Sequence, residues 1–160
     1  MHIEIETDIN GPKVRELIAA HVASALARIK HRESFRPFAP SILDEATAEY
    51  FEQSYPDPFM LKVSPVRPEK RGAIPAVTHV DGTGRLQVVE QNTNSLYYRL
   101  LEAFERETGV PVVLNTSFNL KGEPIVNSPD DAISTFLRSD MDALVMGSHL
   151  IGKHSRGVPA

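Results

Sequence analysis

The chain has 160 residues, of which 41% are hydrophobic and 24% charged, with a formal net charge of −4. These values are ordinary for one globular domain, and the negative charge argues against binding nucleic acid by bulk charge. The sequence contains no cysteine, which excludes disulfides and thiolate chemistry. Its first residues lack the basic start and apolar run of a signal peptide, and no apolar run reaches membrane-spanning length. We therefore expect a cytoplasmic protein without membrane contact.

The N-terminal part predicts a short edge strand over residues 1–10 and an amphipathic helix over residues 12–29. Five cations gather at the end of this helix and just beyond it, namely Arg28, Lys30, His31, Arg32 and Arg36. Two interpretations stand side by side. The cations can complement the dipole at the C-terminus of a helix, or they can form an anion site in which arginine forks grip phosphate oxygens. The stiff apolar stretch 37–40 would then pack on the core and fix Arg36 in place.

The middle of the chain predicts three further elements. Residues 41–53 have the spacing of a short helix, and residues 59–66 have the composition of a strand. Residues 76–80 and 85–90 flank the sequence Asp81-Gly-Thr-Gly84, which predicts a β-hairpin because Asp-Gly is a strong turn signal. The charged connection 67–72 between them is typical of a surface loop.

The predicted hairpin also carries candidate chemistry. His79 and Asp81 stand close together in sequence, and Arg85 leaves the turn beside them. An Asp–His pair can perform acid–base work when its geometry is right. The alternative is that these residues only build the turn.

An amphipathic helix is predicted from Ser95 to Thr108, with Leu96, Leu100, Leu101 and Phe104 on one face and Gly109 as its end. A short buried strand over residues 111–114 follows, and then the polar side chains Asn115, Thr116, Ser117 and Asn119. Ligands of open α/β sheets lie beyond the carboxyl ends of strands. Amides and hydroxyls at that place can recognise a small planar group, or they can merely satisfy the loop's own backbone.

Ser128 predicts a helix start, because proline and two aspartates follow it. A strand is predicted over residues 143–146, and residues 148–151 either extend it or pair with it. Residues 154–160 are predicted to form a frayed tail. Strands and helices without a strict alternation indicate one α/β (α+β) domain. Its expected form is a twisted, partly antiparallel open sheet with flanking helices.

Three stretches, residues 27–40, 77–87 and 113–125, together resemble the C-terminal domain of the O-carbamoyltransferases, which act in nodulation-factor decoration and antibiotic biosynthesis. The resemblance covers residues 22–153, whereas residues 1–21 do not match. It implies a YrdC-like fold that binds carbamoyl phosphate and ATP and forms carbamoyl adenylate. It implies catalytic roles for Arg36, Arg85, Asn115 and Ser117, and substrate-binding roles for Lys30, Arg32, Asn119, His79 and Asp81.

The resemblance also implies a division of labour. In this family a separate N-terminal domain carries the metal and passes the carbamoyl group to a hydroxyl, here a sugar with nodulation factor favoured. We therefore expect no metal site in this chain and a separate metal-binding domain or subunit as its partner. The chain would be one product of a split gene, a partner subunit or a truncated relic.

The alternative function is a non-catalytic domain that binds nucleotide or RNA, which the net charge disfavours. For the enzyme, we predict that Lys30, Arg32, Arg36 and Arg85 converge on one anion site beside Asn115 and Ser117.

Overall fold

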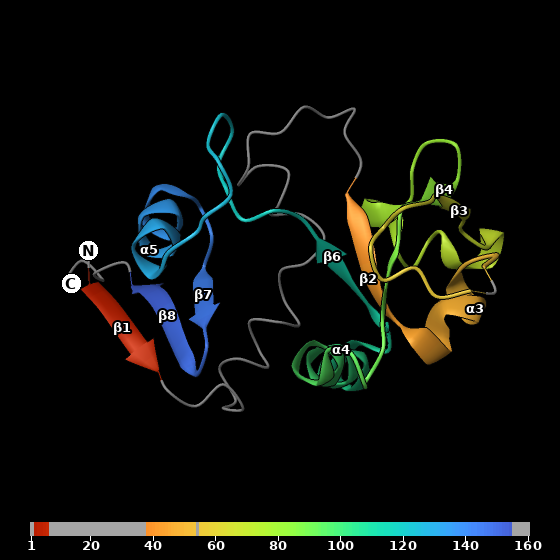
Figure 1. Ribbon diagram of the computed structural model, residues 1–160, viewed down its shortest axis with the longest axis horizontal. Coiled ribbons are helices and arrows are strands. Elements are labelled where there is room, and N and C mark those ends of the chain that lie inside the picture. Colours follow the sequence, from red (N-terminus) through yellow and green to blue (C-terminus); the bar gives the residue numbers. More distant parts are fainter. Residues whose placement is uncertain (1, 7–37, 54, 155–160) are drawn as a thin grey trace, which may run out of the picture. The chain divides into compact units, whose positions relative to one another are not determined.

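The computed structural model describes residues 2–6, 38–53 and 55–154. The chain divides into two compact units (Figure 1). We call residues 34–116 the central unit, and residues 1–33 with 117–160 the terminal unit. The helix predicted over residues 12–29 and all five cations from Arg28 to Arg36 lie outside the described residues.

The central unit is built on the three-stranded sheet β5-β2-β6 (Figure 1). Strand β2 (Ala39–Leu43) lies in the middle, parallel to β5 (Gln87–Val89) and antiparallel to β6 (Val112–Asn115). All five residues of β2 are buried. Pro40 is tolerated in this central strand because β5 pairs with β2 only from Ser41 onward, so its missing N–H costs no bond to β5.

The helix predicted over residues 41–53 is therefore wrong in its first part. The chain is extended to Leu43, turns through the 3-10 helix η1 (Asp44–Ala46) and forms only one α-helical turn, α3 (Thr47–Tyr50). An apolar run that is buried on both faces fits a strand as well as a helix, and the neighbouring strands decide the outcome.

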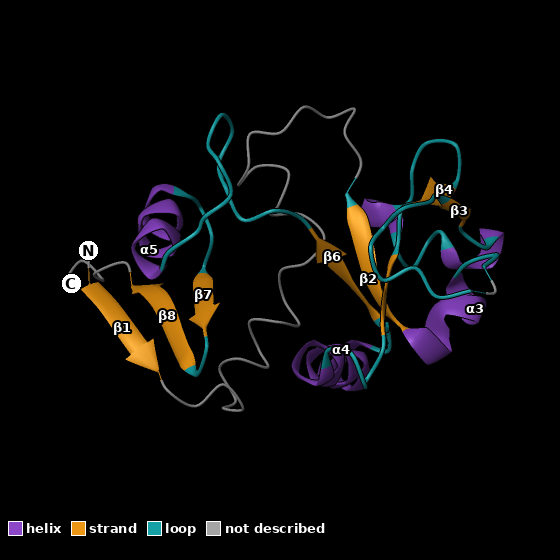
Figure 2. Ribbon diagram, viewed as in Figure 1, coloured by secondary structure: helices purple, strands orange, loops and turns teal. Residues whose placement is uncertain are grey.

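The hairpin predicted over residues 76–90 is also wrong. The first half, residues 76–80, contains no strand, and the turn residues Thr83–Gly84 form β4, which pairs antiparallel with β3 (Ser64–Pro65). The second half contains β5, which pairs with β2. The strand predicted over residues 59–66 is reduced to the two residues of β3. Two 3-10 helices, η2 (Pro68–Lys70) and η3 (Pro75–Val77), occupy the connection between β3 and β4. The short elements of this region are visible in Figure 2.

Helix α4 (Ser95–Thr108) confirms its predicted bounds. The Asn94 side chain accepts a hydrogen bond from the Tyr97 N–H at 3.3 Å, and Gly109 ends the helix in the left-handed conformation with φ 73°. The predicted buried face is only partly right. Leu101 and Phe104 are buried together with Tyr98, whereas Leu96 and Leu100 are exposed. The helix packs against β2 and β6 through this rotated face.

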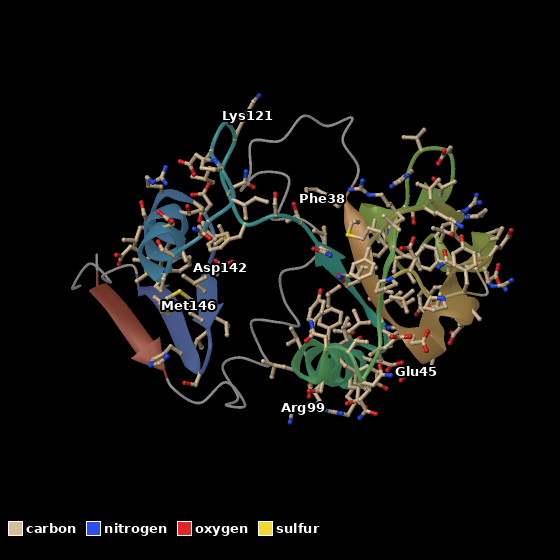
Figure 3. All side chains as sticks on the ribbon, viewed as in Figure 1. Phe38, Glu45, Arg99, Lys121, Asp142 and Met146 are labelled. Atoms are coloured by element: carbon tan, nitrogen blue, oxygen red, sulfur yellow. The ribbon has the colours of Figure 1, made fainter. Side chains whose placement is uncertain are left out.

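Tyr98 fastens α4 to the turn after β2. Its hydroxyl donates a hydrogen bond to the carboxylate of Glu45, which lies beside α4 in Figure 3. This bond is the main cause that raises the pKa of Tyr98 to about 12, and burial adds to it.

We expect the contribution of Tyr98 to stability to be complete below pH 10 and to disappear as the pH rises from 10 to about 12. Stability is lost as the pH rises, because only the protonated phenol can donate to Glu45. Ultraviolet absorbance titration of the phenols should show a late step that Tyr98→Phe removes. The matched variant Tyr55→Phe changes an exposed tyrosine and should leave that step in place. A late step that survives in Tyr98→Phe would contradict the assignment.

The terminal unit contains the antiparallel sheet β1-β8-β7, formed by β1 (His2–Glu6), β8 (His149–His154) and β7 (Ala143–Met146). Helix α5 (Pro129–Arg138) begins as predicted, because the Ser128 hydroxyl accepts from the Asp131 N–H at 3.1 Å. Its buried Phe136 packs with Leu144 and Ile151. The edge strand, the capped helix and the pair β7–β8 confirm the predictions. His154 still belongs to β8, and residues 155–160 of the predicted tail lie outside the described residues.

The predicted fold class is confirmed: helices and strands are mixed, and the sheets are open and partly antiparallel. The described strands form three sheets instead of the single sheet that the sequence suggested. Among the described helices, none is long and apolar enough to cross a membrane.

Candidate functional site

Asn115 ends strand β6 at one end of the central sheet. In the strand register it lies opposite Ala39, the first residue of β2, and Gln87, the first residue of β5, lies opposite Ser41. The carboxyl end of β6 and the amino ends of β2 and β5 therefore meet at the same end of the sheet. The position of Asn115 at a strand end, which the sequence predicted, is confirmed.

An amide network joins the three strands at this end. Gln87 Oε1 accepts hydrogen bonds from Ser41 Oγ at 2.9 Å and from Asn115 Nδ2 at 2.7 Å. Gln87 Nε2 donates to the carbonyl oxygen of Pro58 at 3.2 Å. Asn115 Nδ2 also contacts Met60 Sδ at 3.6 Å. Each strand thus contributes one polar side chain, and residues 58–60 close the network from a loop.

A buried carboxylate shapes that loop. Asp57 is only 4% exposed, and its two oxygens accept from the Leu61 N–H at 3.1 Å and the Lys62 N–H at 3.0 Å. The Asp57 carbonyl accepts from the Val88 N–H at 3.0 Å, which ties the loop to β5. Met60 has φ 57°, a left-handed conformation that is uncommon for a side chain of its size. The loop therefore holds a strained residue directly against Asn115.

Tyr97 on α4 borders the network through Ser41. Burial raises the pKa of its phenol, and the hydrogen bond with Ser41 acts in the opposite direction. Tyr97 therefore stays protonated at neutral pH and serves the network as a neutral hydrogen-bonding group.

The turn that carries His79 and Asp81 is held by Thr83. The Thr83 hydroxyl and N–H donate to Asp81 Oδ1 at 2.7 and 3.0 Å, and these bonds are the main cause that lowers the pKa of Asp81. His79 Nδ1 lies 3.0 Å from the same hydroxyl oxygen. The structure thus brings His79 and Asp81 together through Thr83, in an arrangement that also serves the turn itself.

Gly82 in the same turn is required by its backbone conformation, and the Arg71 side chain lies directly over it. Its φ is +82°, and a Cβ at this position would lie 2.6 Å from the guanidinium carbon of Arg71. The Arg71 Nε donates to the Val66 carbonyl at 3.1 Å. The turn therefore supports a cation that the sequence had assigned to a surface connection.

The predicted anion site is covered only in part by the described residues. Arg85 is exposed and lies two residues before Gln87 in the chain. Lys30, Arg32 and Arg36 lie outside the described residues, so their convergence with Arg85 stays a prediction.

Ser117 and Asn119 belong to the terminal unit. Ser117 Oγ donates to Asn119 Oδ1 at 2.7 Å, and Asn119 Nδ2 donates to the Glu123 carbonyl at 2.8 Å. The Glu123 carboxylate pairs with Arg138 of α5, which is the main cause that lowers its pKa. The structure therefore shows how Ser117 and Asn119 are held, and their predicted roles with substrate stay predictions.

Sequence reasoning missed Gln87 and Ser41 of the network and also Asp57, which shapes the neighbouring loop. Gln87 offered a signal, because it is a polar residue between Leu86 and Val88 in a strand and ends one of the three characteristic stretches. Ser41 lies inside an apolar run, where a serine attracts little notice. Asp57 gave no signal at all, because an aspartate between two prolines is typical of an exposed turn.

Within residues 2–6, 38–53 and 55–154, no group of three or more His, Asp or Glu side chains is placed to hold a metal ion. The donors at the amide network are neutral amides and hydroxyls, which suit an uncharged polar ligand group.

Comparison with known proteins gives the family. Residues 15–153 match the family described as Carbamoyltransferase C-terminus. The nodulation protein NolNO of Sinorhizobium fredii is 54% identical over 134 residues, which are 81% of this chain and 19% of that protein. The nodulation protein NolO of Bradyrhizobium diazoefficiens is 51% identical over 132 residues, 79% of this chain and 24% of that protein. The 3'-hydroxymethylcephem-O-carbamoyltransferase of Amycolatopsis lactamdurans is 38% identical over 124 residues, 78% of this chain and 24% of that enzyme.

The fold defines the chain as a mixed α/β protein with open sheets, and polar side chains lie at the strand ends of its central sheet. More narrowly, the chain belongs to the carbamoyltransferase C-terminus family, because the match covers most of its length. It spans between 19% and 24% of the length of these three relatives.

Proposed function

We propose that this chain is the carbamoyl-activating part of an O-carbamoyltransferase, which binds carbamoyl phosphate and ATP and forms carbamoyl adenylate. The observation that carries the proposal is the Asn115 amide, held at a strand end by Gln87 within a chain of this family. A carbamoyl group is small, planar and uncharged, with one N–H₂ donor and one carbonyl acceptor. A neutral amide network matches such a group better than it matches a charged one.

The reaction balances in two steps. Water cleaves carbamoyl phosphate to carbamate and phosphate. A carbamate oxygen then forms a bond to the α-phosphorus of ATP while the bond to pyrophosphate breaks, which gives carbamoyl adenylate and pyrophosphate. Both steps place negative charge on phosphate oxygens, so they need cations near the amide network.

Arg85 and Arg36 are the cations that we assign to the phosphates, together with Lys30 and Arg32. Arg36 precedes Ala39 by three residues, and Ala39 lies opposite Asn115.

The carbamoyl group would then pass to a sugar hydroxyl, with nodulation factor favoured because two relatives are named nodulation proteins. A separate metal-binding domain or subunit would perform this transfer, in agreement with the larger size of the relatives. We place the reaction in the cytoplasm, where ATP is available.

Carbamoyl phosphate-dependent exchange of labelled pyrophosphate into ATP tests the activation step. We expect exchange with the parent chain and a large loss in Asn115→Leu. The matched variant Asn92→Leu changes an exposed asparagine of a turn and should exchange as the parent does. A folded chain that binds neither substrate and supports no exchange would contradict the proposal.

The fork of Arg36 gives a sharper prediction. Arg36→Lys keeps the charge but loses the paired contact with phosphate, so affinity for carbamoyl phosphate or ATP should fall by roughly 1.5–3 kcal/mol. Titration calorimetry measures this change. Arg106→Lys, at an exposed position in the last turn of α4, is the matched control. Equal affinities of Arg36→Lys and the parent would argue against bidentate binding.

A further inference from the structure

One backbone carbonyl fixes which way the amide groups of the network are oriented. The oxygen of Pro58 can only accept a hydrogen bond, so the end of the Gln87 side chain that faces it must be the N–H₂ group. Gln87 Oε1 must then face Ser41 and Asn115. Because an oxygen needs a donor opposite it, Asn115 is required to turn its own N–H₂ group toward Gln87.

The carbonyl oxygen of Asn115 is thereby left for a ligand. Both hydrogens of Nδ2 have acceptors, Gln87 Oε1 at 2.7 Å and Met60 Sδ at 3.6 Å. Within the described part of the chain, Asn115 Oδ1 accepts no hydrogen bond. Every buried side-chain nitrogen or oxygen there has a partner, so this unpaired oxygen is not buried. Asn115 is half-buried, so its free oxygen is at the surface of the central unit.

The loop that supplies Pro58 is built to stay in place. Both oxygens of the buried Asp57 carboxylate hold the backbone of the loop, and its carbonyl is tied to Val88. Left-handed residues such as Met60 persist where the surroundings determine them strongly, and they gather at functional sites. The loop therefore holds the Pro58 carbonyl in place, and this carbonyl sets the orientation of Gln87 and, through it, of Asn115.

We infer that Gln87 is a positioning residue that presents Asn115 Oδ1 as a hydrogen-bond acceptor and so selects ligands that carry an N–H₂ group. This inference rests on the proposed function and adds to it a rule for specificity. Carbamoyl phosphate can donate to Oδ1, whereas acetyl phosphate, in which a methyl group replaces the N–H₂ group, cannot. Sites built to hydrogen-bond a group reject analogues that lack it, because their own polar atom stays unpaired.

The experiment compares the affinities of the 160-residue chain for carbamoyl phosphate and acetyl phosphate by titration calorimetry. We expect the parent to prefer carbamoyl phosphate by about three- to tenfold, the worth of one hydrogen bond. Gln87→Met has a similar length but no amide, so Asn115 is free to turn over and the preference should fall to about twofold or less. Affinity for acetyl phosphate should change little. The matched control Gln91→Met changes an exposed glutamine just after β5 and should keep the parent's preference.

The variant Gln87→Glu distinguishes the role of Gln87 in orienting Asn115 from its contribution to the stability of the fold. A glutamate keeps an oxygen toward Ser41 and Asn115 while losing the donor to Pro58, so it should lower stability but retain the preference for carbamoyl phosphate. A folded Gln87→Met that keeps the parent's preference would overturn the inference and leave the proposed function standing. A parent chain that binds neither carbamoyl phosphate nor ATP would overturn both.

Discussion

Replacing Phe51 with alanine is expected to lower the free energy of unfolding by about 3–5 kcal/mol, since it removes a fully buried aromatic ring from the central core. Its neighbours cannot easily close the cavity. Phe51 forms a bridge with Val66, and its ring lies 3.0 Å from the place that a Cβ on Gly84 would take. Gly84 lies three residues before Gln87, so a shift here should also reach the amide network. Urea unfolding measures the stability, and calorimetry with carbamoyl phosphate measures the site.

Phe59→Ala is the matched control, because the same atoms are removed from a side chain that is 77% exposed. We expect a change of no more than about 0.5 kcal/mol. Similar losses in both variants would show that the core of the central unit is not organised around Phe51.

Local signals predicted much of the fold, and they did so where a short stretch decides its own structure. The capped helix that begins after Ser128 and the helix that ends at Gly109 follow from side chains within one turn of each end. The failures are non-local. The Asp-Gly turn forms, but β4 and β5 pair with β3 and β2, because partners distant in sequence bury Val66, Leu86 and Val88 together. Sequence spacing cannot rank such pairings.

The same distinction separates the parts of the candidate site. Asn115 was predictable, since it follows a short apolar strand and begins a polar cluster. Gln87 and Ser41 became site residues only through the parallel pairing of β5 with β2, which no local pattern announces. The role of Asp57 depends on burial, because its carboxylate acts on the backbone of its own loop and only then on Asn115.

Replacing Asp57 with alanine should lower stability strongly, although the residue lies outside the apolar core. Two backbone N–H groups lose a charged acceptor, and hydrogen bonds to charged groups are worth roughly 1.5–3 kcal/mol each. Water can reach the exposed Leu61 and Lys62, which offsets part of this loss, so we expect a net cost of about 2–4 kcal/mol. Urea unfolding measures it. Asp44→Ala, which removes an exposed carboxylate from η1, should change stability by no more than about 0.5 kcal/mol.

The consequence of Asp57→Ala for the site should follow from its effect on the loop. Without the carboxylate, the loop loses the two hydrogen bonds to Leu61 and Lys62 that help to hold the left-handed backbone of Met60, so it should relax and withdraw the Pro58 carbonyl and Met60 Sδ. Gln87 then loses the acceptor that fixes the orientation of its amide. The preference for carbamoyl phosphate over acetyl phosphate should therefore fall as it does in Gln87→Met. Hydrogen exchange at the Leu61 and Lys62 amides reports the loop directly. If those amides stay protected in Asp57→Ala, or if the preference persists after their protection is lost, the loop does not orient Asn115.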